Sequence, residues 1–135
     1  MQNKSLALDY IRRSVKRLKA LETLYQEEAW PDVVRESQEV VELSLKSLLR
    51  YYNIEFPRVH DVSGILESEK TRFPTEVRGH LTRMIKISKS LRRDRELAFY
   101  GSEDLTPSEF YHAEDSKEAF DGARRVYDLC RTTCA

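Results

Sequence analysis

Basic side chains gather on two stretches of the chain in a pattern that could bind phosphate. In residues 78–95 only Asp94 is acidic, and the basic residues are Arg78, Arg83, Lys86, Lys89, Arg92, Arg93 and Arg95. Residues 4–19 are similar, with Asp9 as the only acid, whereas acids dominate residues 103–121. Basic helices could therefore form a surface for a nucleotide or RNA. The alternative is a solvated, self-complementary surface on which basic helices lie beside acidic ones.

Arg95 occupies an unusual position in this pattern. The inward-facing stripe of Leu81, Met84, Ser88 and Leu91 continues, in steps of three and four residues, to Arg95 and then Ala98. An arginine on a core-facing line must pair with an acid, emerge at the end of the bundle or face a ligand. A snorkelling or salt-bridged arginine is the purely structural alternative.

The connection that follows Arg95 could cover such a ligand. About fifteen residues separate two predicted helices between Tyr100 and Glu114, and helix connections in bundles are usually shorter. This connection contains Pro107, Tyr111 and His112.

Other residues with chemical potential give weaker patterns. The pair His60-Asp61 resembles the dyad of metal phosphohydrolases, but the other histidines show no matching ligand spacing, and a helix N-cap is the alternative. Cys130 and Cys134 share one face of a predicted helix, which suits two buried thiols; an intersubunit metal site or disulfide is the alternative. The sequence has no Gly-rich phosphate loop and no HExxH, so we expect neither cofactor nor metal.

Helices must position these residues. Apolar residues recur at helical spacing in about 3–27, from Pro31 to Tyr52, and in about 74–99 and 115–133, with a short helix at about 60–70. Pro31 suits the first position of a helix, Gly101 suits a helix end, and Asp115 with Glu118 has capping-box spacing. The pattern predicts an all-α fold, an up-and-down four-helix bundle with an additional short helix.

Length and composition fit one domain over residues 1–135. The 135 residues include 40% hydrophobic and 34% charged residues, with only 4 Gly and 4 Pro, which argues against both disorder and a turn-rich β fold. The formal net charge is zero, so only local asymmetry of charge could recruit a partner. No apolar run is long enough for a membrane helix, and the predicted location is the cytoplasm.

Three segments carry a resemblance to a known family. The helix from Arg35 to Leu49, followed by Pro57 and the pair His60-Asp61, resembles the HEPN (higher eukaryotes and prokaryotes nucleotide-binding) domain. Residues 91–101 resemble the end of the family's later long helix, and residues 111–127 resemble its last helix. The resemblance covers nearly the whole chain and implies a helical bundle that is usually a homodimer.

The resemblance also implies a choice of functions. Many members are metal-independent ribonuclease toxins that use an arginine with a histidine four to six residues after it, and others are non-catalytic partners of a nucleotidyltransferase in a toxin–antitoxin-like pair. Here four intervening residues after Arg95 lead to Tyr100, and four after Arg93 lead to Ala98. Neither side chain replaces imidazole as a proton carrier near neutral pH.

These observations lead to one interpretation and two alternatives. The chain is interpreted as a nucleotide- or RNA-binding module without robust catalysis of its own. Arg92, Arg93 and Arg95 would contact phosphate, and Tyr100 would stack on or hydrogen-bond the ligand. The alternatives are a ribonuclease that uses Arg95 with Tyr100 or His112, and a pure protein-interaction module. A nucleotidyltransferase and a second copy of the chain are the expected protein partners.

Overall fold

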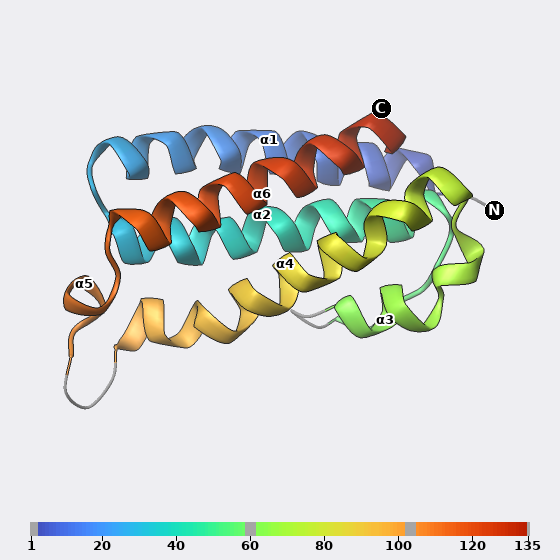
Figure 1. Cartoon of the computed structure of the whole chain (residues 1–135). Coiled ribbons are helices and arrows are strands. Elements are labelled where there is room, and N and C mark those ends of the chain that lie inside the picture. Colours follow the sequence, from blue (N-terminus) through green and yellow to red (C-terminus); the bar gives the residue numbers. More distant parts are fainter. Residues whose placement is uncertain (1–2, 59–61, 102–104, 135) are drawn as a thin grey trace.

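The chain forms helices and connecting loops. The computed structural model describes residues 3–58, 62–101 and 105–134, and within α4 the side chains of residues 93–99 lie outside the description. The elements are α1 (Lys4–Gln26), α2 (Trp30–Tyr51), α3 (Ser63–Ser68), the 3-10 helix η1 (Lys70–Arg72), α4 (Thr75–Tyr100), α5 (Pro107–Phe110) and α6 (Ala113–Cys134). Successive long helices run in opposite directions (Figure 1). No strand occurs in the described ranges, so the predicted all-α, up-and-down bundle is confirmed.

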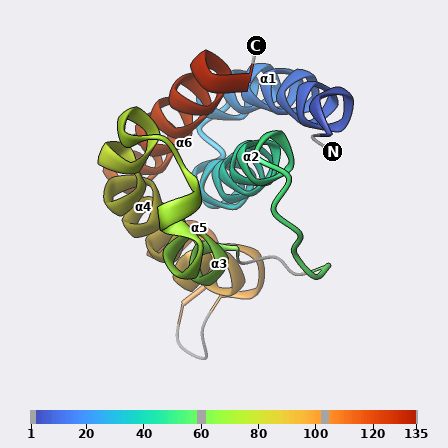
Figure 2. The ribbon, with the colours of Figure 1, turned by 90° about the vertical axis from the view of Figure 1, so that its right-hand side faces the viewer.

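Helix α2 is the centre of the bundle. Viewed end-on, α1, α6 and α4 surround it, and each packs along it (Figure 2). The predicted stripe of valines and leucines is buried, including Val33, Val41 and Leu45. Burial also extends to Gln38 and Glu42, so α2 is covered on more sides than its apolar pattern indicates.

The other long helices bury the predicted stripes on one face. In α1 the stripe includes Ile11 and Leu18, in α4 Leu81 and Met84, and in α6 Val126. These residues belong to one hydrophobic core cluster. None of the described helices is both long and apolar enough to span a membrane.

Helix α6 begins two residues earlier than predicted. Its first residue is Ala113, and the backbone N–H of His112 donates to Oδ2 of Asp115 at 2.9 Å. Asp115 therefore lies at the third helical position and reaches back to the residue before the helix, as the acid of a capping box does. The predicted start at Asp115 is wrong because an acid with this spacing serves the first turn from inside the helix.

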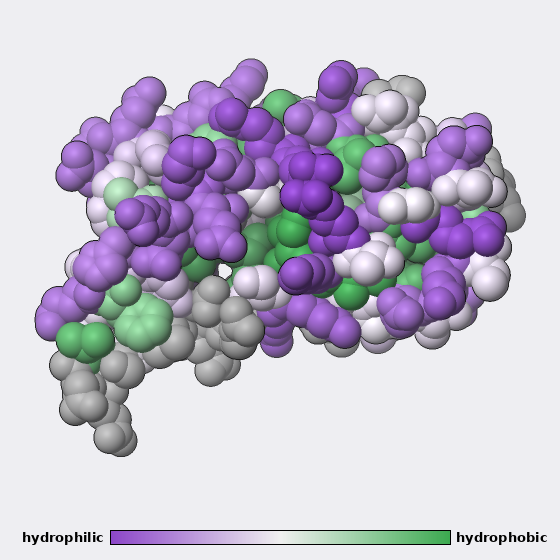
Figure 3. All heavy atoms as spheres, viewed as in Figure 1, coloured by the Kyte–Doolittle hydropathy of each residue, from purple (hydrophilic) through white to green (hydrophobic). Residues whose placement is uncertain are grey.

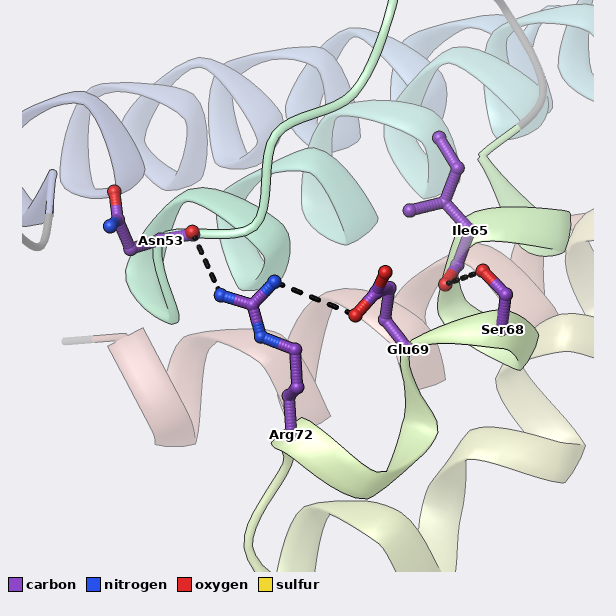
Figure 4. Close-up of polar contacts among 5 residues, drawn as sticks. All are labelled: Asn53, Ile65, Ser68, Glu69 and Arg72. Carbon is purple, nitrogen blue, oxygen red and sulfur yellow. Dashed lines mark hydrogen bonds and ion pairs between the residues drawn. The ribbon is translucent and has the colours of Figure 1, made fainter.

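The connection between α2 and α4 contains α3 and η1. Arg72 of η1 donates to the backbone carbonyl of Asn53 at 3.2 Å and lies 3.5 Å from the carboxylate of Glu69 (Figure 4). The predicted short helix is present as α3, but its N-cap is Val62. The predicted caps, His60 and Asp61, lie outside the described residues.

The connection from α4 to α6 folds back against the end of α4. Gly101 has φ +81°, and a Cβ there would lie 2.8 Å from Cδ of Pro107, so a larger residue would be strained. Helix α5 begins at Pro107, and the side chain of Thr106 both accepts from the backbone N–H of Glu109 and donates to its carboxylate. The predicted long loop therefore contains a capped turn of helix.

Candidate functional site

The end of helix α4 presents the predicted binding residues. Arg92 is exposed, and Tyr100, the last residue of the helix, is 77% exposed. They are eight positions apart in the helix, which is about 12 Å along the axis. Arg93 and Arg95 are on the same helix, but their side chains lie outside the described part. The site residues therefore share one helix end, and the direction of the Arg95 side chain stays a prediction.

Exposed apolar side chains concentrate at the same corner of the molecule. The exposed large hydrophobic residues in the described ranges are Tyr100, Leu105 and Phe110, which lie at the end of α4 and in the α5 connection. Phe110 makes an edge-on contact with the buried ring of Tyr111, with 5.0 Å between ring centroids. His112 follows and is exposed. Aromatic rings on a surface beside cations can stack on bases.

The basic stretches of α1 and α4 form separate surfaces. Helix α6 lies between the two helices in the end-on view (Figure 2). Arg17 of α1 pairs with Glu36 of α2 at 2.8 Å, and Arg124 of α6 lies 3.6 Å from Glu22 of α1. Two ion pairs therefore connect α1 to neighbouring helices, and within one chain the described parts of the two basic stretches lie on different sides of α6.

A groove separates α4 from the first half of α6. Its volume is about 1210 Å³, and Phe110 of α5 and the following Tyr111 line one end. Ile87 and Leu91 line it from α4, and Ala119 lines it from α6. Figure 3 shows a strip of hydrophobic surface between the two helices, bordered by hydrophilic side chains. Sequence reasoning missed this groove because no single helix pattern shows how far apart two helices lie.

A buried polar cluster on α2 was also missed. Glu42, only 6% exposed, accepts from Nε2 of Gln38 at 3.2 Å and from Nζ of Lys46 at 2.7 Å. Phe56 lies beside it, with the guanidinium of Arg50 4.5 Å and the ammonium of Lys46 5.8 Å from the ring centroid. The four-residue spacing of Gln38, Glu42 and Lys46 is the signal that could have revealed it. Buried charge of this kind needs its partners, so we assign the cluster a structural role.

The thiols of α6 are buried in the core, as predicted. Both cysteines are free. Burial raises the pKa of Cys130 well above its ordinary value, and the pKa of Cys134 to about 11, although the Ser47 hydroxyl 3.8 Å from its sulfur acts in the opposite direction. Both thiols are therefore protonated at neutral pH, which makes them poor nucleophiles.

The chain is similar to known proteins in sequence and in fold. The family model described as the HEPN domain matches residues 7–133. The crystal structure of an archaeal HEPN homologue superposes with a TM-score of 0.66 at 21% identity, covering 96% of this chain and 98% of that one. No curated protein matches the chain.

Proposed function

The chain belongs to the HEPN domain family, and from this premise we propose that it is a nucleotide- or RNA-binding module without robust catalysis of its own. In this proposal it acts as a homodimer and as the partner of a second protein. The family resemblance suggests a nucleotidyltransferase in a toxin–antitoxin-like pair.

The observation that carries the proposal is the surface at the end of α4. Arg92 and Tyr100 are both exposed there and about two helical turns apart. Guanidinium groups make charge-assisted hydrogen bonds to phosphate, and an exposed aromatic ring stacks on a base of any type. Arg93 and Arg95 would add phosphate contacts on the same helix end.

The missing histidine supports a binding role over a nuclease role. No histidine follows Arg93 or Arg95 at the family's spacing. The alternative ribonuclease would use Arg95 with Tyr100 or with His112, which is exposed and belongs to the connection that packs against the end of α4.

Binding to a labelled single-stranded RNA, and separately to ATP, tests the proposal. Affinity should fall steeply with salt because phosphate contacts release counterions. Arg92→Ala and Arg95→Ala should each weaken binding several-fold more than Arg83→Ala, and Tyr100→Ala should remove one stacking contact worth about 1–3 kcal/mol.

Other outcomes would contradict parts of the proposal. Equal losses for Arg83→Ala and Arg95→Ala would reduce the site to diffuse charge, and unchanged binding would remove the nucleic-acid role. RNA cleavage that persists in chelator and is lost in His112→Ala would favour the ribonuclease. A monomer in light scattering at tens of micromolar, a concentration at which ordinary dimers form, would contradict the homodimer.

A further inference from the structure

The groove between α4 and α6 has a basic wall and an acidic wall. Arg83 and Lys86 line it from α4. The α6 wall is acidic on balance, because four carboxylates line it beside two cations: Glu114, Asp115, Glu118 and Asp121, with Lys117 and Arg125. All these side chains are exposed, and no ion pair within the described residues connects one wall to the other. Lys117 and Asp121 pair with each other, whereas the charges of Arg83, Lys86, Glu114 and Glu118 are available to a ligand.

The groove is long, and the apolar side chains that α4 contributes to it, Ile87 and Leu91, lie toward its α5 end. Gly79 and Leu91 both line it, and the segment of α4 between them spans about 18 Å at about 1.5 Å per residue, which corresponds to about three helical turns. A Cβ added to Gly122 of α6 would lie only 3.2 Å from Cγ2 of Ile87, so the two helices approach closely at that point. Phe110, 41% exposed, extends the apolar surface at the α5 end.

These features fit a polypeptide helix better than a nucleic acid. RNA carries negative charge along its whole length, and the carboxylates of Glu114 and Glu118 would repel it. The volume of about 1210 Å³ exceeds the range of about 300–1,000 Å³ that is usual for small-molecule sites. A groove with an apolar floor between two long helices is the shape that accepts an amphipathic helix.

We propose that the α4–α6 groove binds an amphipathic helix of a partner polypeptide. The apolar face of that helix lies on Ile87 and Leu91, its acidic flank faces Arg83 and Lys86, and its basic flank faces the α6 carboxylates. The inference rests on the proposed function only for the existence of a protein partner, and it does not use the residues at the end of α4.

Three synthetic helical peptides with the same apolar face provide the probes. The first has one acidic and one basic flank, the second has two acidic flanks, and the third has two basic flanks. Exchanging the flanks of the first peptide is not a useful control, because a helix bound in the reverse direction restores the match. We expect the mixed peptide to bind most tightly, in the micromolar range.

Three protein variants test the location of binding. Arg83→Glu/Lys86→Glu makes both walls acidic, so affinity for the mixed peptide should fall at least about tenfold and affinity for the basic peptide should rise. Arg12→Glu/Lys16→Glu makes the same change of charge on exposed positions of α1 and should alter neither. Gly79→Trp should fill the groove and block the peptide without disturbing the core, because nothing lies within 4 Å of a Cβ at that position.

The outcomes separate this inference from the proposed function. Absence of peptide binding, equal effects of the α1 and α4 charge variants, or unchanged binding in Gly79→Trp would each overturn the inference, whatever the result for RNA. Loss of RNA binding in Gly79→Trp would assign the groove to RNA and would also overturn it. If the protein binds the peptide but neither RNA nor ATP, the result would support the peptide-binding role of the groove and contradict the nucleic-acid role.

Discussion

The centre of the bundle around α2 and the groove between α4 and α6 show opposite ways of using helix surfaces. α2 contacts three long helices, and even Glu42 and Gln38 are buried on it. α4 and α6 are close where Ile87 meets Gly122, and charged residues of both helices line the space that remains. The number of neighbours of a helix, more than its own apolar pattern, therefore decides which of its side chains lose contact with water.

The largest effect should distinguish a central leucine from a groove residue. Leu45 is completely buried, so Leu45→Ala should lower the free energy of unfolding by about 2–5 kcal/mol through lost burial and a cavity. Ile87 is partly buried, and Ile87→Ala should lower it by less than about 2 kcal/mol. Urea denaturation of both variants measures the difference.

A matched control uses an exposed residue. Leu105→Ala removes the same atoms as Leu45→Ala from a side chain that is 40% exposed, and it should change stability by no more than about 0.5 kcal/mol. Equal losses of unfolding free energy for Leu45→Ala and Ile87→Ala would show that the groove is as tightly packed as the centre. That result would contradict the difference between the two regions.

A second effect concerns the charge buried on α2. Lys46→Met removes the ion pair with Glu42 while keeping most of the side-chain volume, so the free energy of unfolding should fall by about 1–3 kcal/mol. Glu42→Met/Lys46→Met should recover part of this loss because no unpaired charge is then buried. Lys86 and Glu118 on the groove walls provide the matched control. Lys86→Met and Lys86→Met/Glu118→Met should each change the free energy of unfolding little, because both side chains are exposed. A Lys46→Met variant as stable as the parent would mean that water already solvates Glu42.

The helices could be predicted from the sequence, whereas their spacing could not. Periodicity identified the four long helices and their buried stripes, because each repeat is a property of one segment. Helix α5 was missed since four residues are too few to show a period, although Thr106, Pro107 and Glu109 carry its capping signal. The burial of Glu42 and the groove beside Ile87 depend on how distant segments pack. The Arg92–Tyr100 surface could be predicted because both residues belong to one helix.

A third effect depends on pH and on the thiols near the centre. An unfolded thiol titrates near 9.0, whereas burial raises the pKa of Cys134 to about 11 and that of Cys130 also upward. The unfolded state releases protons first, so the free energy of unfolding should fall as pH rises above about 9, by up to about 1.4 kcal/mol per pH unit for each thiol. Urea denaturation between pH 8 and 10 measures this slope. Cys130→Ala/Cys134→Ala should be less stable but should lack the slope below pH 10; the same slope in that variant would assign it to other groups.

The smallest effect tests the narrowest point of the groove. Alanine is favoured over glycine inside a helix by about 1 kcal/mol, so Gly79→Ala, which meets nothing within 4 Å, should raise the free energy of unfolding by about 0.5–1 kcal/mol. Gly122→Ala should gain less, because its Cβ would lie 3.2 Å from Cγ2 of Ile87, and the Ile87 side chain or the helix that carries it must shift slightly. In an Ile87→Ala background that contact is absent, and Gly122→Ala should then recover the full gain. This double-mutant cycle therefore measures the α4–α6 contact itself, and equal gains for Gly122→Ala in both backgrounds would mean that the helices can separate there without cost.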